Sequence, residues 1–201
     1  MRIVPVFAVN FGEVGFLATL DPDGLDEAFG RAFAGGFDTL AVPGITVGRP
    51  QGQWTAMNDI SVHRKAGFRV ADLAYGLAGE EIGRVRCDGL VVSTPQGSTG
   101  YNLANGGPVL AWGVRGFVVS FIAPHSLTAR SLVVAPDDLL TVHNRSAGTV
   151  DVSIDGRPAG ELAAGATVRI GFLREAADLA LLPGATFYRR LRDTFGRLAS
   201  S

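Results

Sequence analysis

Residues Asp88–Pro108 read DGLVVSTPQGSTGYNLANGGP, which is an acid, a short apolar run and then a loop of hydroxyls and glycines. The run Leu90–Val92 predicts a short buried strand, because β-branched side chains suit a pleated surface. In the loop that follows, glycines let the backbone approach a ligand closely, and hydroxyl groups can both donate and accept hydrogen bonds. The stretch therefore predicts a strand that ends in an uncharged binding loop for a sugar, an amide or a purine edge. A polar turn between two strands is the alternative.

On both sides of this stretch, the sequence alternates short apolar runs with Gly, Pro, Asp and Asn. Many short strands at such a spacing are typical of an antiparallel β-sandwich or a related β architecture. We expect strands at Leu40–Val47, Trp54–Val62, Gly67–Ala74, Leu90–Val92, Phe117–Phe121, Leu132–Val134, Leu139–Val142, Val150–Ile154 and Thr167–Leu173.

The two ends of the chain have different patterns. The continuous apolar run Ile3–Val9 predicts a strand that is buried on both faces, as in a parallel sheet. Thr186–Leu198 predicts a helix with arginines on its polar side. The sequence as a whole predicts an α+β fold that is mostly β: an antiparallel β-sandwich-like domain with the remnant of an N-terminal α/β lobe.

Asp21–Phe33 predicts another helix. Asp21 or Asp23 can cap its N-terminus, and a pair of glycines at residues 35 and 36 ends it. Because helix-facing apolar side chains are usually part of a core, we expect one face of this helix to be buried. That face consists of Leu25, Ala28, Phe29 and Ala32.

The composition excludes several classes of protein. The chain has 201 residues with 18 basic and 19 acidic side chains, and its net charge of −1 predicts no nucleic-acid surface. Lys65 is the only lysine, so a phosphate-binding Gly-Lys-Ser/Thr loop is excluded. No apolar stretch reaches the ~18–20 residues of a membrane span, and we expect no membrane partner. The apolar start, Met1–Val9, is read as a strand and not as a signal peptide.

The sulfur and imidazole side chains predict no metal site. Cys87 is the only cysteine, which excludes an internal disulfide and a cysteine zinc site. We expect Cys87 to be a buried core residue, and a cytoplasmic location is the simplest inference. His63, His125 and His143 lack the spacing of metal ligands, and His125 is expected to have a structural role and not that of a catalytic base.

Asn58–Arg64, which reads NDISVHR, is the second candidate site. An amide beside a carboxylate can recognise two groups at once: the amide pairs with a purine edge, and the carboxylate accepts hydrogen bonds from both hydroxyls of a ribose. An Asn-Asp pair is also common in turns, which is the alternative.

Both stretches resemble a known family. Asp88–Pro108 resembles the central signature of the NAD kinases, in which Asp-Gly, an apolar strand, Ser-Thr-Pro-Thr-Gly-Ser-Thr-Ala-Tyr and Gly-Gly-Pro follow one another. Gln96 stands where Thr is usual, and Gly100 stands where Ala is usual. Asn58–Arg64 is similar to the family's Asn-Glu stretch that ends in Arg, with Asp59 where Glu is usual.

Three further segments are similar to the same family, so that the resemblance covers nearly all of this chain and the latter two-thirds of the family's usual length. Asn10–Leu17 resembles the family's Asn-x-Gly-x-Leu-Gly-Phe-Leu segment, and Pro124–Val133 resembles a Pro-His-containing stretch. Asp155-Gly156-Arg157 resembles a late Asp-Gly-Gln turn with Arg157 in place of Gln, and an ordinary hairpin turn is the alternative. The resemblance implies that residues 1–20 end a truncated α/β lobe. It also implies that residues 21–185 form a β-rich NAD-binding domain and that residues 186–201 form a helix returning toward the first lobe.

The resemblance implies an NAD kinase, which uses ATP and Mg²⁺ to phosphorylate the 2′-hydroxyl of the adenosine ribose of NAD⁺. In the family, Asn58 and Asp59 match residues that hold the adenosine end. Arg86 and Asp88 match positions at the nicotinamide side, often across a subunit interface, which implies a homodimer or homotetramer. The NAD-binding residues carried over from the family are Asn58, Asp59, Arg69, Arg86, Asp88, Ser93, Thr99, Gly100, Tyr101, Asn102, Leu103, Ala104 and Arg157.

The sequence contains no Gly-Gly-Asp-Gly, the family motif whose Asp acts on the 2′-hydroxyl. We therefore assign no catalytic base. Truncation is the favoured explanation; a natural short form and a first lobe on another polypeptide are the alternatives. The alternative function is a catalytically inactive dinucleotide-binding or assembly module. A lipid kinase of the wider superfamily is disfavoured by Asn58-Asp59 and by the complete Ser-Thr-Pro-x-Gly-Ser-Thr run.

Overall fold

The computed structural model describes residues 4–9, 11, 16, 20, 22–49 and 52–196. The chain divides into two compact units, of which one is Pro43–Arg174 and the other combines the residues up to Val42 with those from Glu175 onward. The domain limits after residues 20 and 185 remain a prediction about the lobes of the whole protein.

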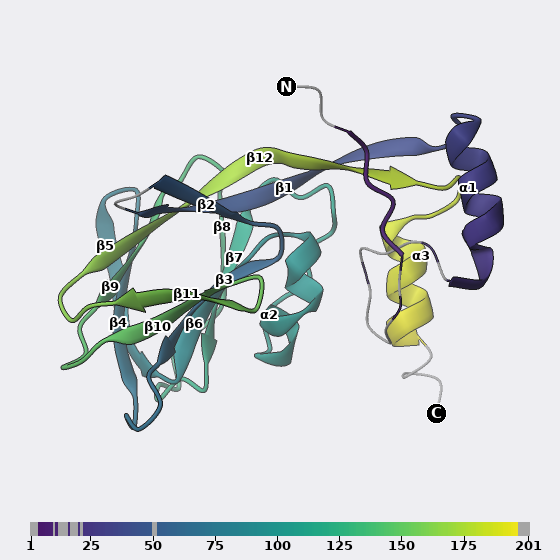
Figure 1. The fold of residues 1–201 in the computed structure, drawn as a ribbon. Coiled ribbons are helices and arrows are strands. Elements are labelled where there is room, and N and C mark those ends of the chain that lie inside the picture. The colour runs from purple at the N-terminus through teal and green to yellow at the C-terminus, as the bar shows by residue number, and fades with distance from the viewer. Residues whose placement is uncertain are drawn as a thin grey trace. The chain divides into compact units, whose positions relative to one another are not determined.

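Two six-stranded sheets form the larger unit (Figure 1). Two of their strands, β1 and β12, continue along the chain into the smaller unit. The first sheet has the order β2 (Gly52–Ala56), β1 (Asp38–Arg49), β12 (Thr167–Leu181), β9 (Leu140–Asn144), β4 (Ala71–Leu77) and β5 (Glu80–Cys87). The second has the order β11 (Arg157–Leu162), β10 (Val150–Ile154), β3 (Asp59–Arg64), β6 (Gly89–Ser93), β7 (Phe117–Ile122) and β8 (Leu132–Val134). The pairings of β3 with β6 and β10, and of β6 with β7, are antiparallel, as the sequence predicts.

The core of the larger unit is made of inward-facing side chains from both sheets. Along β3, Ile60 and Val62 are fully buried in this core, which leaves Asp59, Ser61 and His63 on the opposite face of the strand. All of β6 is buried, because a 3₁₀ turn at Gln96–Thr99 and the short helix α2 (Tyr101–Ala104) contact it. The fully buried large side chains include Ile45, Leu73, Leu90, Phe117, Leu140 and Ile170.

The structure confirms the mostly β fold but corrects several elements. Trp54–Val62 is two strands, because Met57 and Asn58 form a turn between β2 and β3. The sequence analysis missed β5 and β11, which lie at the edges of the two sheets. Both missed strands expose most of their side chains, so neither carries the apolar run from which the other strands were predicted.

The smaller unit departs further from the expectations. Val4 and Val6 are 73% and 55% exposed, and Val6 forms an isolated parallel bridge with Leu179, so the predicted strand buried on both faces is wrong for the described residues 4–9. The segment Asn10–Leu17 lies outside the described residues except for positions 11 and 16.

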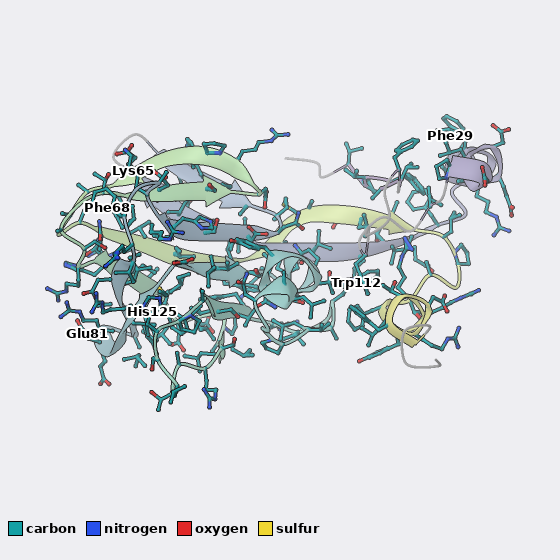
Figure 2. The ribbon with its side chains drawn as sticks, turned by 90° about the horizontal axis from the view of Figure 1, so that it is seen from below. Phe29, Lys65, Phe68, Glu81, Trp112 and His125 are labelled. Carbon is teal, nitrogen blue, oxygen red and sulfur yellow. The ribbon has the colours of Figure 1, made fainter. Side chains whose placement is uncertain are left out.

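The helix predicted at residues 21–33 begins later. A 3₁₀ turn at Pro22–Gly24 precedes α1 (Leu25–Phe33), whose N-cap is Gly24 without a side-chain hydrogen bond, so the predicted Asp23 cap is wrong; Asp21 lies outside the described residues. Of the expected apolar face, Ala28 is buried, whereas Phe29, labelled in Figure 2, is 53% exposed.

The C-terminal helix begins where the sequence predicts. The hydroxyl of Thr186 accepts a hydrogen bond from the backbone N–H of Arg189 (3.2 Å) at the start of α3 (Phe187–Leu191). A π-helical turn at Arg192–Gly196 follows, and residues 197–201 lie outside the described part. None of the described helices is long and apolar enough to cross a membrane.

Candidate functional site

The turn between β2 and β3 carries Asn58 and Asp59, and a distant carboxylate holds its backbone. The Asp155 carboxylate accepts hydrogen bonds from the backbone N–H groups of Met57 (2.9 Å), Asn58 (2.7 Å) and Asp59 (3.1 Å). The backbone N–H of Asp155 in turn donates to the carbonyl of Asp59 (2.9 Å). Three adjacent amides that point at one carboxylate form an anion-binding nest, and bonds to a charged acceptor are among the strong ones.

Asp155 reaches this turn from a two-residue hairpin. Ile154 pairs with Arg157, so Asp155 and Gly156 are the two central residues of the turn between β10 and β11. Both have positive φ, 47° and 73°, which is the geometry of a type I′ turn and explains the Asp-Gly sequence. Residues 155–157 therefore form a hairpin turn, and a contact of Arg157 with NAD stays a prediction.

The loop after β6 holds the same turn from the other side. Thr94 donates from its backbone N–H to the Asn58 carbonyl (2.9 Å) and from its hydroxyl to the Met57 carbonyl (2.7 Å). The Gln96 amide donates to the carbonyls of Met57 (2.6 Å) and Pro43 (2.5 Å). Because a Cβ at Gly97 would collide with the Asn58 carbonyl, only glycine allows this close approach.

These contacts leave the side chains of the turn available. Asn58 is exposed, and its side-chain amide forms no hydrogen bond within the described part of the chain, although its backbone N–H donates to Asp155. Asp59 lies opposite Ser93 in the pairing of β3 with β6. Among the described residues, the Ser93 hydroxyl and the Gln96 amide oxygen are buried without a hydrogen-bond partner, so polar atoms at this turn remain unsatisfied.

Asp59 has an altered acidity. Burial, and to a lesser extent the charge of the neighbouring Asp155, raise the pKa of its carboxyl to about 6. Near neutral pH, Asp59 is thus mostly ionised, but it takes up a proton under mildly acidic conditions.

Tyr101 lies beside the same turn. Its ring stacks on His63, with centroids 5.7 Å apart and an interplanar angle of 22°, and the Nε2 atom of His63 lies 2.8 Å from the Ser61 hydroxyl. Burial, and then the charges of Asp59 and Asp88, raise the pKa of the Tyr101 phenol. Tyr101 is 38% exposed, and its phenol lies close enough to Asp59 and Asp88 for their charges to raise its pKa.

Asp88 connects β5 to β6 and pairs with Arg64 of β3. The side chains of Asp88 and Arg64 form an ion pair, with 2.9 Å between Oδ1 and Nε. The backbone carbonyl of Asp88 also accepts a hydrogen bond from the backbone N–H of Arg64 (2.9 Å). The side chain of Arg86 is exposed, and its backbone carbonyl accepts a hydrogen bond from the backbone N–H of His125 (2.7 Å), which Figure 2 labels.

Cys87 lies between Arg86 and Asp88 but has no sign of reactivity. Burial raises the pKa of the Cys87 thiol to about 12, which agrees with a core residue and not with a nucleophile.

Asn102 differs from its neighbours in the loop, because its side chain is fully buried. Its amide donates to the carbonyls of Ser98 (2.8 Å) and Pro108 (3.0 Å), and its oxygen accepts the Ser120 hydroxyl (2.6 Å). Thr99 is also buried and donates to the Gln96 carbonyl (3.3 Å). The side chains of Asn102 and Thr99 therefore shape the loop, whereas Gly100, Tyr101 and Ala104 are exposed and Leu103 is partly buried.

Two predicted site residues have no described contact with Asn58, Asp59, Asp88 or Tyr101. Arg69 is exposed in the bend that follows β3, and Arg157 is exposed at the start of β11. The only lysine, Lys65, which Figure 2 labels, forms an ion pair with Glu161 of β11. In the described part of the chain, no three His, Cys, Asp or Glu side chains come together as metal ligands.

The sequence analysis missed the role of Asp155. Its Asp-Gly pair signals a hairpin turn, but no spacing along the chain indicates that its carboxylate reaches residues 57–59. The contact arises because β10 pairs with β3 in the sheet, with Ile154 opposite Ile60.

Residues 57–180 match the ATP-NAD kinase C-terminal domain. The chain belongs to the NAD kinase family. It is 33% identical over 204 residues to an NAD kinase of Gemmatimonas aurantiaca, a match that covers 97% of this chain and 70% of that protein. It is 35% identical over 201 residues to an NAD kinase of Rhodopirellula baltica, covering 96% of this chain and 64% of the relative.

Solved NAD kinase structures share the fold. A crystal structure of an NAD kinase from Archaeoglobus fulgidus in complex with ATP matches with a TM-score of 0.80 and 26% identity, over 100% of this chain and 76% of that one. A yeast NADH kinase complexed with NADH matches with a TM-score of 0.85 over 100% of this chain and 62% of that one; its identity is 22%, so that this match supports the fold alone. All the NAD-binding residues that the sequence predicts lie within the family match, between Asn58 and Arg157.

Proposed function

We propose that this chain holds NAD⁺ for transfer of the ATP γ-phosphoryl group to the 2′-hydroxyl of its adenosine ribose, the reaction of an NAD kinase. The observation that carries the proposal is the Asn58-Asp59 turn, held through its backbone from two sides while its side chains stay available beside Tyr101. Family membership supports the reaction class. The chain spans 64% to 70% of the length of the two relatives described above. The activity of those whole proteins is therefore proposed for this chain and not assigned to it.

Each side chain has a chemical role in the proposal. Asn58 offers an amide that can pair with the adenine edge, and Asp59 offers a carboxylate that can accept the ribose hydroxyls. The exposed face of Tyr101 can stack on an aromatic base, a contact worth about 1–3 kcal/mol per base in single-stranded nucleic-acid binding. Arg86 and Asp88 are proposed to bind at the nicotinamide side, in an assembly of two or four copies.

The exposed part of the loop completes the proposed site through its backbone. The buried side chains of Thr99 and Asn102 support this loop, whose Gly100–Ala104 segment would lie along the dinucleotide. The buried Ser93 hydroxyl, which has no partner among the described residues, stays a candidate NAD-binding group. Arg69 and Arg157 remain candidates from the family resemblance only. Mg²⁺ would enter as the complex of ATP, and the cytoplasmic location remains a prediction.

A dinucleotide-binding module without turnover is the second candidate. It is favoured by one observation, the lack of Gly-Gly-Asp-Gly and hence of an assigned base in these 201 residues. The two functions share the binding site and differ only in phosphoryl transfer.

Calorimetry followed by an enzyme assay separates the two candidates. The chain is titrated with NAD⁺, and ATP with Mg²⁺ is then added while NADP⁺ is measured. Binding with NADP⁺ formation supports the kinase, whereas binding without NADP⁺ supports the module. The absence of binding by the folded chain would refute both.

A further inference from the structure

Asp155 is the residue on which the geometry of the Asn58-Asp59 turn depends. Its carboxylate accepts three consecutive backbone amides, those of Met57, Asn58 and Asp59, and no described side chain other than Asp155 accepts a hydrogen bond from these amides. Thr94 and Gln96 hold the carbonyl side of the same turn. The Asp155 carboxylate therefore fixes the amide side, and with it the direction in which the two side chains leave the backbone.

The type I′ turn itself requires the positive φ of Asp155, 47°, so this φ is no evidence for a further role. The negative charge of Asp155 is evidence, because an uncharged residue such as Asn could form the same turn. Its charge also lies near the carboxylate of Asp59. An uncharged turn residue would avoid this repulsion, so the anionic side chain is explained by the amides that it binds.

We infer that Asp155 is a positioning residue: by holding the amides of residues 57–59, it orients Asn58 and Asp59 toward the adenosine end of the dinucleotide without touching the ligand itself. This inference rests on the proposed function. Asp155 acts through both Asn58 and Asp59, so part of its effect depends on the ribose hydroxyls whose hydrogen bonds the Asp59 carboxylate accepts.

That dependence provides the test. Wild type, Asp155→Ala and Asp155→Asn are titrated with NAD⁺ and with an NAD⁺ analogue whose adenosine ribose lacks both hydroxyls. Asp155→Ala is expected to lower the affinity for NAD⁺ by about tenfold or more and the affinity for the analogue by a smaller factor, because the analogue keeps the adenine edge that Asn58 pairs with but cannot use Asp59. Asp155→Asn keeps one acceptor oxygen and is expected to fall between the two.

The matched control is Asp137→Asn. Asp137 is an exposed aspartate that pairs with Arg174 (2.7 Å), and the control removes one carboxylate charge without touching the turn. It is expected to leave the affinity for both ligands as in wild type. An equal loss of both affinities in Asp155→Ala, or no loss of either, would overturn the positioning role.

A second measurement keeps the inference testable if the proposed function fails. If wild type binds neither ligand, the proposed function is refuted, and amide hydrogen exchange at Asn58 and Asp59 then decides the positioning role. Exchange is expected to be faster in Asp155→Asn and Asp155→Ala than in wild type and Asp137→Asn. An unchanged exchange rate at both amides would contradict the inference.

Discussion

At the scale of single residues, the candidate site depends on how carboxylates are placed. Asp59 stands where the family usually has Glu, and its shorter side chain lies beside the carboxylate of Asp155 in a partly buried turn. Burial and this second charge both favour the protonated form of Asp59. The sequence identified Asp59 as a candidate but gave no indication of its acidity, because both causes come from residues that only the fold brings together.

The first prediction concerns pH. Because only the ionised carboxylate accepts hydrogen bonds from both ribose hydroxyls, and because the pKa of Asp59 is raised to about 6, affinity for NAD⁺ should weaken as the pH falls through 6. We expect the Kd to rise about tenfold between pH 7 and pH 5, measured by calorimetry. Asp59→Asn should bind NAD⁺ weakly at both pH values.

His63 is the control for this pH dependence, because it lies beside Tyr101 and burial lowers its pKa while Asp151 opposes that shift. A His63→Gln variant should keep the pH dependence of NAD⁺ binding. If His63→Gln abolishes the dependence and Asp59→Asn retains it, the role assigned to Asp59 is wrong.

At the scale of elements, the strands that contain apolar runs were predicted from the sequence, whereas the strands that form mainly through backbone pairing with a neighbour were not. Leu90–Val92 was correctly predicted as a buried strand, because its side chains face the core on one side and the loop on the other. The edge strands β5 and β11 were missed, since their stability comes from backbone pairing with β4 and β10 and not from an apolar pattern. Phe29 was predicted as core from helical spacing but is exposed, because spacing gives the face of a helix and not what covers it.

The second prediction concerns the contact between the loop and the turn. Gly97→Ala places a Cβ against the Asn58 carbonyl, so the loop and the turn must separate. Overpacking of this kind costs about 1–3 kcal/mol, and a lower melting temperature with weaker NAD⁺ binding is expected.

The control for this prediction is Gly113→Ala, since an added Cβ there meets no atom within 4 Å. Calorimetric melting should show a loss of stability for Gly97→Ala alone. Equal melting temperatures for the two variants would show that the close approach at Gly97 is not required.

At the scale of the whole molecule, the sequence motifs indicated the NAD kinase family, and the match to the family's C-terminal domain shows it. The arrangement of the candidate site became visible only in the structure. The resemblance named Asn58, Asp59 and Asp88 as neighbours of one ligand, and the fold brings Tyr101 close to both carboxylates. The family resemblance did not indicate that the side chain of Asn102 is buried and hydrogen-bonded within the protein. A buried amide and a ligand-binding amide cannot be distinguished in a sequence. The central claim is thus a dinucleotide site on the outer face of the second sheet, around residues 58–59 and 100–101.

Backbone NMR of the labelled chain during titration with NAD⁺ tests this claim most directly. We predict that the amide signals of Asn58, Asp59, Gly100 and Tyr101 shift with saturation, while Thr141 and Arg169 in the first sheet keep their positions. Shifts centred on the first sheet, with none at residues 58, 59, 100 and 101, would contradict the account.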